Sequence, residues 1–255
     1  MRQLIPPPVR DREPDLSAAY AYPDRALRWT RANMVSSADG AAQSDGVSAG
    51  LSGPADKKLF RVLRALADVV LVGASTVRTE GYGSAAVVRE EFQEARAAAG
   101  QTPAPAIAVV SGSLDLDFGS RLFTEAAVPT ITVTIEDAPA DRLAAARAAG
   151  EVIVAGTGRV DLRRAVDLLA ESRRGRILCE GGPSLLGGLA AADRLDELCV
   201  TLSPVLVGGP ASRIVHGPAI DPPRRLVLHS LLAEDGFLFA RYTVGEPDLS
   251  SDHDE

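Results

Sequence analysis

The amino-acid sequence predicts an α/β fold, in which a central, mostly parallel sheet carries helices on both faces and ends in antiparallel C-terminal strands. Short, continuous apolar runs recur along the chain, which is the pattern of strands that a parallel sheet buries on both faces. Helical segments separate most of these runs up to Leu195, but the strand-like segments beyond it have no long helix between them. This change of rhythm indicates antiparallel strands added to a parallel sheet. The 255 residues, 46% of them hydrophobic, can bury such a core without disulfides or metals.

The first elements expected are a strand and a helix. Residues 29–36 alternate in polarity as a strand does, and the Asp39-Gly40 pair ends that strand in a turn. A helix begins near Pro54, because proline is tolerated in a first helical turn and Asp56 suits the positive end of the helix dipole. The apolar face of this helix has helical spacing and consists of Leu59, Val62, Leu63 and Leu66.

Further strands and one more well-marked helix follow. Asp161 is the expected N-cap of a helix whose apolar face is formed by Leu162, Ala165, Val166 and Leu169. The continuous apolar runs predict buried strands at 68–73, 106–110, 130–135, 152–155 and 176–179. The C-terminal strands are expected at 198–202, 225–232 and 237–244.

The chain is expected to form one domain with two peripheral segments. Residues 1–25 contain five prolines and no periodicity, which indicates a leader that lies over the surface. Residues 26–245 form the domain, without an internal repeat. Residues 246–255 form an acidic tail, which is expected to be disordered.

Composition argues against several classes of function. The formal net charge is −7 and no basic block occurs, so nucleic acid is not an expected partner. No apolar run reaches the roughly 18 residues of a membrane span, and no signal peptide precedes the domain, so we expect a cytoplasmic protein without a membrane partner. Cys179 and Cys199 lie inside apolar runs and are expected to be buried free thiols. The three histidines lack metal-ligand spacing, so no metal is expected.

Two strand-to-helix turns are rich in small residues. They are Gly73 to Val77 and Glu180 to Gly188, and each follows a predicted buried strand. Glycines let a diphosphate approach the backbone, and the N-terminus of the next helix offers free N–H groups. Taken alone, each turn could equally be a tight connection. Glu180 directly follows a buried run, where its carboxylate either meets a ligand or complements the dipole of the next helix.

Two other motifs resemble known sites in sequence only. Gly81 to Ala86 fits a relaxed dinucleotide fingerprint, but no strand precedes it directly and no acidic residue follows at the required distance. Gly46 to Gly50 matches the nucleophile elbow of serine hydrolases around Ser48, with His216 and His229 downstream. The small, polar residues before Gly46 argue against this second interpretation, which is kept as an alternative.

Taken in order, the motifs resemble the reductase domain of riboflavin-biosynthesis pyrimidine reductases, within the dihydrofolate-reductase-like superfamily. The resemblance covers most of residues 28–245. The motifs that carry it are RANMVSSADG from Arg31, LRALADVVLVGASTVR from Leu63, EGGP from Glu180, LDEL from Leu195 and LSPVLVGG from Leu202.

The resemblance implies a dihydrofolate-reductase-like fold and NADPH as cofactor. On the nicotinamide side it implies Ser37, Asp39 and Gly40. Ser111 or Ser113 is implied near the adenosine 2′-phosphate, without a basic residue that would select NADPH. The remaining implied cofactor contacts are Gly73, Thr76, Val77, Glu180, Gly181, Gly182, Pro183, Ser184 and Leu185.

The resemblance also implies a substrate side, on which Ser48, Ser52 and Arg64 hold a ribityl phosphate or the base. An anionic substrate needs a cation such as Arg64, although a solvated helix charge is the alternative. Asn33 stands where the family often has Lys. Asp56 is the first candidate for proton or ring-nitrogen contact, and Glu80 is the second.

Two sequence differences bear on the reaction. The family's Asp-Asp-Pro is replaced by Glu80-Gly81-Tyr82, and the zinc-binding motif of the deaminase half is absent from these residues, so deamination by that route is not expected.

The sequence therefore predicts an NADPH-dependent reductase that transfers hydride to ribose C1′ of a ribosylaminopyrimidine phosphate. The resemblance implies a homodimer formed through sheet edges. The alternative on the same fold is reduction of dihydrofolate or another pterin, in which Asp56 would pair with the pterin amino group and ring nitrogens. A serine hydrolase and a nucleotide-binding protein without catalysis are more distant alternatives.

Overall fold

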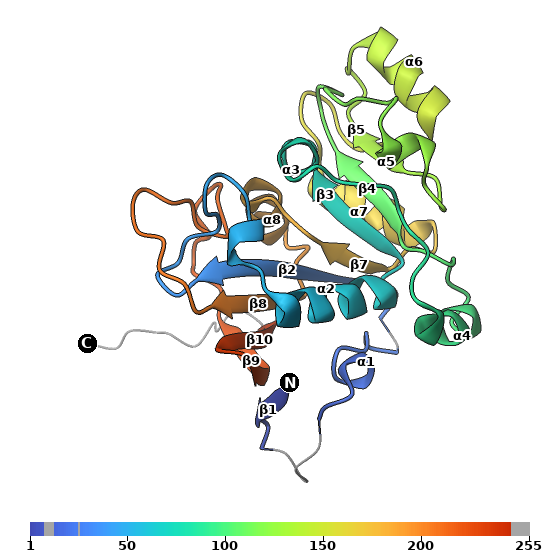
Figure 1. The fold of residues 1–255 in the computed structure, drawn as a ribbon. Helices are drawn as coiled ribbons and strands as arrows, with labels where there is room; N and C mark the ends of the chain where they lie inside the picture. The colour runs from blue at the N-terminus through green and yellow to red at the C-terminus, as the bar shows by residue number, and fades with distance from the viewer. Residues whose placement is uncertain (8–12, 25, 246–255) are drawn as a thin grey trace, which may run out of the picture.

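The structure is a computed structural model that describes residues 1–7, 13–24 and 26–245. Its described strands form one ten-stranded sheet in the order β1-β9-β10-β8-β2-β7-β3-β4-β5-β6 (Figure 1). From β8 to β6 in this order, each strand runs parallel to its neighbours. The pairs β1–β9, β9–β10 and β10–β8 are antiparallel. The strands are β1 (Arg2–Ile5), β2 (Trp29–Ser37), β3 (Val69–Gly73), β4 (Ala106–Val110), β5 (Ile131–Thr134), β6 (Glu151–Val154), β7 (Arg176–Cys179), β8 (Glu197–Ser203), β9 (Leu226–Glu234) and β10 (Phe237–Val244).

The helices connect these strands. They are α1 (Leu16–Ala19), the short 3₁₀ helix η1 (Ala49–Leu51), α2 (Pro54–Leu66), α3 (Ala74–Glu80), α4 (Glu90–Ala98), α5 (Arg121–Thr124), α6 (Ala140–Ala149), α7 (Leu162–Glu171) and α8 (Pro183–Ala191). Asp161 accepts a hydrogen bond from the Arg164 N–H and is the N-cap of α7, as predicted. The mixed sheet with antiparallel C-terminal strands is therefore confirmed, and β4, β7 and β10 have the predicted bounds.

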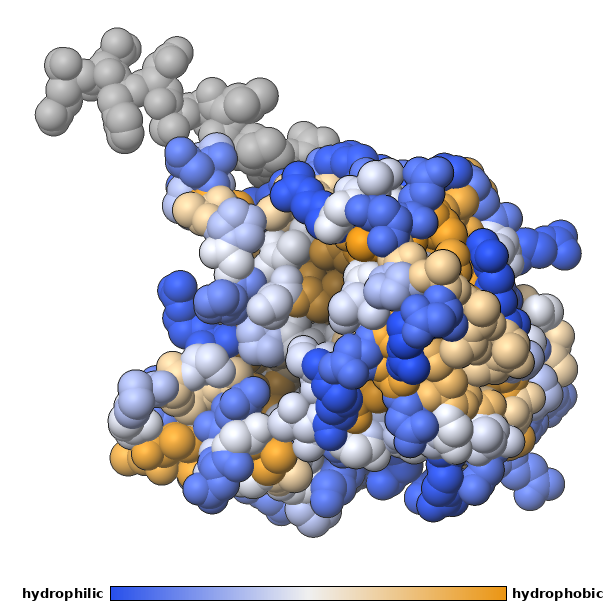
Figure 2. Space-filling model, turned by 90° about the horizontal axis from the view of Figure 1, so that it is seen from above, coloured by the Kyte–Doolittle hydropathy of each residue, from blue (hydrophilic) through white to orange (hydrophobic). Residues whose placement is uncertain are grey.

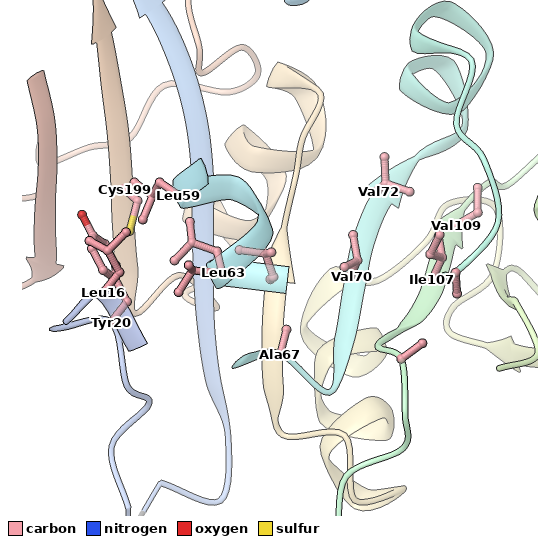
Figure 3. Packing of buried hydrophobic residues seen from close by; sticks show 14 of the residues in the cluster. Leu16, Tyr20, Leu59, Leu63, Ala67, Val70, Val72, Ile107, Val109 and Cys199 are labelled. Atoms are coloured by element: carbon pink, nitrogen blue, oxygen red, sulfur yellow. The ribbon is translucent and has the colours of Figure 1, made fainter. Parts of the chain in front are cut away.

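Helices cover both faces of the sheet, and the alternation of side chains along β3 shows how. Val70 and Val72 belong to the core cluster that contains Leu59 and Leu63 of α2. Figure 3 shows these side chains in one layer, together with Ile107 and Val109 of β4. The intervening β3 residues, Val69 and Leu71, belong to a second cluster with apolar residues of α7 and α8. Side chains two residues apart share a face of a strand, so a continuous apolar run fills both cores.

The N-terminal segment 1–25 is not a leader over the surface, and that expectation needs correction. β1 pairs with β9, so the segment adds a strand to the sheet. Leu16 and Tyr20 are buried in the same cluster as Leu59 (Figure 3). The prolines break the periodicity on which the prediction relies, but Leu16, Tyr20 and Tyr22 are still buried. The predicted acidic tail, 246–255, lies outside the described residues.

This segment also covers a buried ion cluster. Glu197 of β8, which is fully buried, accepts hydrogen bonds at Oε1 from Arg31 Nε of β2 (2.6 Å) and Arg241 Nε of β10 (2.8 Å). The ring of Tyr22 lies with its centroid 4.2 Å from the Arg31 Cζ. Burial alone would raise the pKa of the Glu197 carboxyl, but the two guanidinium groups lower it below its usual value. The cluster therefore links three strands and the N-terminal segment.

Both cysteines are free and buried, as predicted. Burial raises the pKa of the Cys179 thiol to about 12, which keeps it protonated at neutral pH. None of the described helices is long and apolar enough to cross a membrane.

Seen from above, the molecule has a hollow near the middle of its face, with polar residues around it and apolar residues deeper inside (Figure 2).

Candidate active site

The candidate site is a cleft with two adjoining halves. One half, here called the α2 half, has a volume of about 390 Å³ and is lined by residues of β2, α2 and the segment after α3. The other, the β4 half, has a volume of about 490 Å³ and is lined by residues of α3, the end of β4 and the start of α8. The residues shared by both halves are Gln43, Thr76, Glu80, Gly182 and Pro183. In open α/β sheets ligands bind at the carboxyl ends of the strands, and this cleft lies at the ends of β3, β4 and β7.

The glycine turn between β7 and α8 forms the wall between the halves. The Gly73 N–H donates to the Gly181 carbonyl oxygen (2.8 Å), which brings the start of α3 against the turn. Gly181 has φ +82°, a left-handed conformation that favours glycine. A Cβ on Gly182 would lie 2.7 Å from Thr76 Oγ1, so a side chain there would have to displace Thr76. The turn thus leaves bare backbone beside the N-terminus of α8, an arrangement that fits a diphosphate.

Most of the predicted cofactor residues do meet in the β4 half. Its lining includes Gly73, Thr76, Ser111, Gly182, Pro183, Ser184 and Leu185. Gly181 supports the turn but is not among the lining residues. The lining also includes Arg78, which the sequence analysis did not single out. Its Nη1 donates to the Asp115 carbonyl oxygen (2.6 Å) on the loop after β4.

Two predicted cofactor residues point elsewhere. The Val77 side chain packs against the core cluster that contains Leu59, because it lies on the inner face of α3. Glu180 lines the α2 half and not the β4 half. Strand alternation explains the position of Glu180. Cys179 packs in the cluster with α7 and α8, so the next side chain turns to the opposite face, toward α2.

The residues expected on the nicotinamide side form a turn outside the cleft. Ser37 is fully buried, and its Oγ donates to Asp39 Oδ1 (2.5 Å) and accepts from the Ala41 N–H (2.8 Å). Asp39 also accepts from the Gly208 N–H (2.7 Å) and the Val207 N–H. These bonds, with the one from Ser37 first, lower the pKa of the Asp39 carboxyl to about 2. Asp39 and Gly40 line a separate hollow beside residues 208–214, so the structure does not bring them together with the residues of the β4 half, and their contact with the nicotinamide stays a prediction.

Asp56 provides the buried carboxylate of the α2 half. It lies in the first turn of α2, is 7% exposed, and accepts a hydrogen bond at Oδ2 from Ser52 Oγ (2.5 Å). Asn33 of β2 lines the same half, and its buried Oδ1 has no hydrogen-bond partner among the described residues. A buried amide without a partner is costly, so a ligand group that pairs with it would be stabilised. Carboxylate and amide together can recognise the donor and acceptor edge of a heterocycle.

Arg64 and Glu180 form a two-bond ion pair in the α2 half. Arg64 Nε and Nη2 donate to Glu180 Oε1 and Oε2 at 2.7 and 2.6 Å. The Tyr82 hydroxyl also donates to Glu180, and the Arg64 guanidinium lies over the rings of Phe60 and Tyr82. Burial would lower the pKa of Arg64, but Glu180 raises it above its usual value. Burial and the Glu180 charge raise the pKa of Tyr82, so its hydroxyl remains a donor.

Glu80 lies where the halves meet, and Ser48 lines the α2 half. Glu80 Oε1 accepts from the Ser48 N–H (2.8 Å), which holds the loop before η1 against the end of α3. Ser48 directly precedes η1 and does not follow a buried strand, and no histidine is among the lining residues that the structure describes. His216 instead lies beside Ser184, with Nδ1 and Oγ 3.5 Å apart. The nucleophile-elbow alternative therefore has no support.

Gly81 ends α3 in a left-handed conformation (φ +62°), so this part of the chain is a helix terminus and not a dinucleotide-binding turn.

The α2 half is also lined by three residues that no sequence motif marks: Lys57, Phe60 and Tyr82. The spacing of residues along α2 could have indicated Phe60. Asp56, Phe60 and Arg64 are spaced by four residues and lie on one face of α2. Tyr82 follows a helix terminus without periodicity, so no sequence pattern marks it.

Comparison with known proteins places the chain in a family. The model of the RibD C-terminal domain matches residues 28–235. The 2,5-diamino-6-ribosylamino-4(3H)-pyrimidinone 5′-phosphate reductase of Methanothermobacter thermautotrophicus is 30% identical over 218 residues, which are 83% of this chain and 96% of that protein. The crystal structure of a pyrimidine reductase-like protein from Corynebacterium diphtheriae is 30% identical and has a TM-score of 0.80, covering 91% of this chain and 99% of that one.

More distant relatives share the fold. The riboflavin biosynthesis reductase of Saccharomyces cerevisiae is 16% identical with a TM-score of 0.62, over 88% of this chain and 93% of that one. The resemblance found in the sequence is therefore confirmed. This chain is an oxidoreductase, and it belongs to the RibD C-terminal domain family.

Proposed function

We propose that the protein is an NADPH-dependent reductase of riboflavin biosynthesis, which converts a ribosylaminopyrimidine phosphate into the ribitylamino product. The observation that carries this proposal is the two-part cleft. A bare glycine turn with a helix N-terminus lines one half, and the buried carboxylate of Asp56 lines the other. The named relatives that act on such a pyrimidine support the choice of substrate.

The β4 half fits NADPH. Backbone N–H groups at the start of α8, with the Thr76 hydroxyl beside them, would hold the diphosphate. Ser111 and the guanidinium of Arg78 would face the 2′-phosphate, and Arg78 is the only cation among the described residues that line this half. When bound, NADPH supplies the hydride, and it is oxidised to NADP⁺.

The α2 half would hold the pyrimidine. In the reaction, hydride adds to ribose C1′, the bond between C1′ and the ring oxygen breaks, and that oxygen takes up a proton. Asp56 would orient the base by accepting hydrogen bonds from the amino or ring N–H groups of the pyrimidine. Ser52 fixes the Asp56 carboxylate by donating to Oδ2. Asn33 would pair with a further polar group of the base. Glu80, between the halves, is the second candidate for handling the proton.

NADPH oxidation in the presence of the ribosylaminopyrimidine phosphate tests the proposal. The wild-type protein should oxidise NADPH and yield the ribitylamino product. Asp56→Asn should lower kcat by about 100-fold or more while the Kd for NADPH stays unchanged, because the substituted group lies in the other half. Asp45→Asn is the matched control, since Asp45 is exposed and lines neither half. Failure of the wild type to oxidise NADPH with any ribosylaminopyrimidine phosphate would overturn the proposal.

Reduction of dihydrofolate or another pterin is the second candidate, and the position of Asp56 favours it to the same degree. A carboxylate in the first turn of a helix that borders the cleft can accept hydrogen bonds from a pterin amino group and ring N–H. Parallel assays with dihydrofolate separate the two. Higher kcat/KM for dihydrofolate than for the pyrimidine would select the pterin. NADPH binding without turnover of either would indicate a nucleotide-binding protein.

The proposal includes a homodimer in the cytoplasm. Apolar side chains are exposed on β8, on the loop after it and on β9, where a second copy could cover them: Leu202, Val205, Leu206, Leu226 and Val227. The buried free thiols suit a reducing compartment. Size-exclusion chromatography with light scattering checks the dimer, and a monomer at micromolar concentration would contradict it.

A further inference from the structure

The proposed reaction needs a place where the cofactor and the substrate touch. A hydride passes directly between them, so the reacting ends of both molecules lie where the two halves of the cleft meet. Among the described residues, those that line both halves are Gln43, Thr76, Glu80, Gly182 and Pro183. Four of them belong to α3 and to the start of α8, whereas Gln43 comes from a separate segment, the loop between β2 and η1.

Gln43 differs from the other four residues in having a free polar side chain. Glu80 accepts a backbone N–H at Oε1 (2.8 Å), and the Thr76 hydroxyl lies against the glycine turn, 2.7 Å from where a Cβ on Gly182 would be. Gly182 and Pro183 have no polar side-chain atom. The Gln43 side chain makes no hydrogen bond with any described residue. Its amide oxygen and its NH₂ group are therefore both available to a ligand.

The backbone on either side of Gln43 is held in place. The Ala42 N–H donates to the Ser212 carbonyl oxygen (2.8 Å), on the loop between β8 and β9. The Ser44 N–H donates to the Val47 carbonyl oxygen (2.9 Å), within the turn before η1. The half-buried side chain of Gln43 thus extends from a fixed backbone. A ligand that meets it does not have to order the loop, so most of the hydrogen-bond energy contributes to affinity.

We propose that Gln43 binds the carboxamide of the nicotinamide and so fixes the orientation of the ring where the two halves meet. This inference rests on the proposed function. A carboxamide has one acceptor oxygen and one NH₂ donor group, and the glutamine amide has the same groups, so the two can exchange a pair of hydrogen bonds. The carboxylate of Glu80 can only accept. A ring that is held by its carboxamide presents one fixed position to the substrate, which hydride transfer requires.

The first test separates a contact with the nicotinamide from a general effect on the cleft. The probes are NADPH and 2′-phospho-ADP-ribose, which has the adenosine, the 2′-phosphate and the diphosphate but no nicotinamide. Gln43→Leu should raise the Kd for NADPH about tenfold, as expected for one or two neutral hydrogen bonds, and leave the Kd for 2′-phospho-ADP-ribose unchanged. Gln3→Leu is the matched control, because Gln3 lies on β1 and lines neither half. Isothermal titration measures both constants.

The second test changes the carboxamide itself. In the 3-acetylpyridine analogue of NADP⁺, a methyl group replaces the carboxamide NH₂. The wild type should bind this analogue about fivefold more weakly than NADP⁺, whereas Gln43→Leu should bind the two about equally. A side chain that only supported the loop would leave the ratio between the two cofactors as it is in the wild type. Equal thermal unfolding of the wild type and the variant shows that folding is intact.

The outcomes distinguish this inference from the proposed function. The inference is overturned if Gln43→Leu binds NADPH as tightly as the wild type, or if it binds 2′-phospho-ADP-ribose as poorly as NADPH. It is also overturned if the wild type and Gln43→Leu discriminate equally against the acetylpyridine analogue. A wild type that binds neither NADPH nor 2′-phospho-ADP-ribose would overturn the proposed function and this inference with it. Binding of NADPH that depends on Gln43, without turnover of the pyrimidine, would overturn the proposed function alone.

Discussion

Arg64 of α2 and Glu180 at the end of β7 lie 116 residues apart in the chain and form a two-bond ion pair inside the cleft. The two partners differ in exposure, because the Arg64 side chain is 32% exposed and that of Glu180 is 2% exposed. Removing one partner therefore does not have the same consequence as removing the other. A buried carboxylate without a counterion is costly, whereas a guanidinium near the surface can turn to water.

Arg64→Ala should destabilise the protein more than Glu180→Gln. We expect a loss of about 3 kcal/mol in the free energy of unfolding for Arg64→Ala, and about half of that or less for Glu180→Gln. Urea denaturation measures both. The double variant should be more stable than Arg64→Ala, since it removes the uncompensated charge as well. Equal losses from the two single variants would show that burial of Glu180 does not govern the pair.

Gly182→Ala should weaken cofactor binding. The added Cβ would lie 2.7 Å from Thr76 Oγ1, so Thr76 must move and the bare surface beside α8 is lost. We expect the Kd for NADPH to rise about tenfold or more, corresponding to one or two lost hydrogen bonds with the diphosphate. Gly83→Ala is the control, because a Cβ there meets no atom within 4 Å and Gly83 lines only the α2 half. Unchanged binding in Gly182→Ala, measured by fluorescence titration, would place the cofactor elsewhere.

Arg78→Ala should reduce the preference for NADPH over NADH. A guanidinium that pairs with the 2′-phosphate stabilises only the phosphorylated cofactor, so the Kd for NADPH should rise about tenfold and that for NADH should hardly change. Isothermal titration with both cofactors gives the ratio. Arg121→Ala is the matched control, since its side chain is 80% exposed, pairs with Glu125 and does not line the cleft. Equal weakening of both cofactors would mean that Arg78 acts on the loop after β4 and not on the 2′-phosphate.

Asp39 should make the turn after β2 sensitive to acid. Its pKa is lowered to about 2 from an ordinary value of 3.8, because Ser37, Gly208 and Val207 donate to the ionised carboxylate. Ionised Asp39 therefore stabilises the folded state fully above about pH 4, and this contribution is lost as the pH falls toward 2. The difference in unfolding free energy between the wild type and Asp39→Asn should be present at pH 6 and shrink below pH 4. A difference that stays constant down to pH 2 would contradict the shift.

Much of the parallel part of the sheet could be predicted closely because β3 to β7 follow continuous apolar runs, and such runs need no knowledge of distant residues. Asp56 could be predicted too, since proline and acid in a first helical turn are local signals. The partner of Arg64 could not be predicted, because only the assembled sheet brings the end of β7 next to α2. The sequence also did not show that Glu180 lines the α2 half and not the β4 half. The face on which a side chain lies after a buried strand depends on strand alternation, which the continuous run hides.

The buried cluster of Arg31, Glu197 and Arg241 has a consequence for how far the folding unit extends. The family model begins to match at residue 28. Yet the rings of Tyr20 and Tyr22 cover Arg31, and Arg241 Nη1 donates to the Ala19 carbonyl oxygen (2.5 Å). A fragment cut where sequence similarity starts would open a fully desolvated guanidinium to water and remove a strand from the sheet edge. The region that matches the family is thus shorter than the region whose contacts bury this cluster.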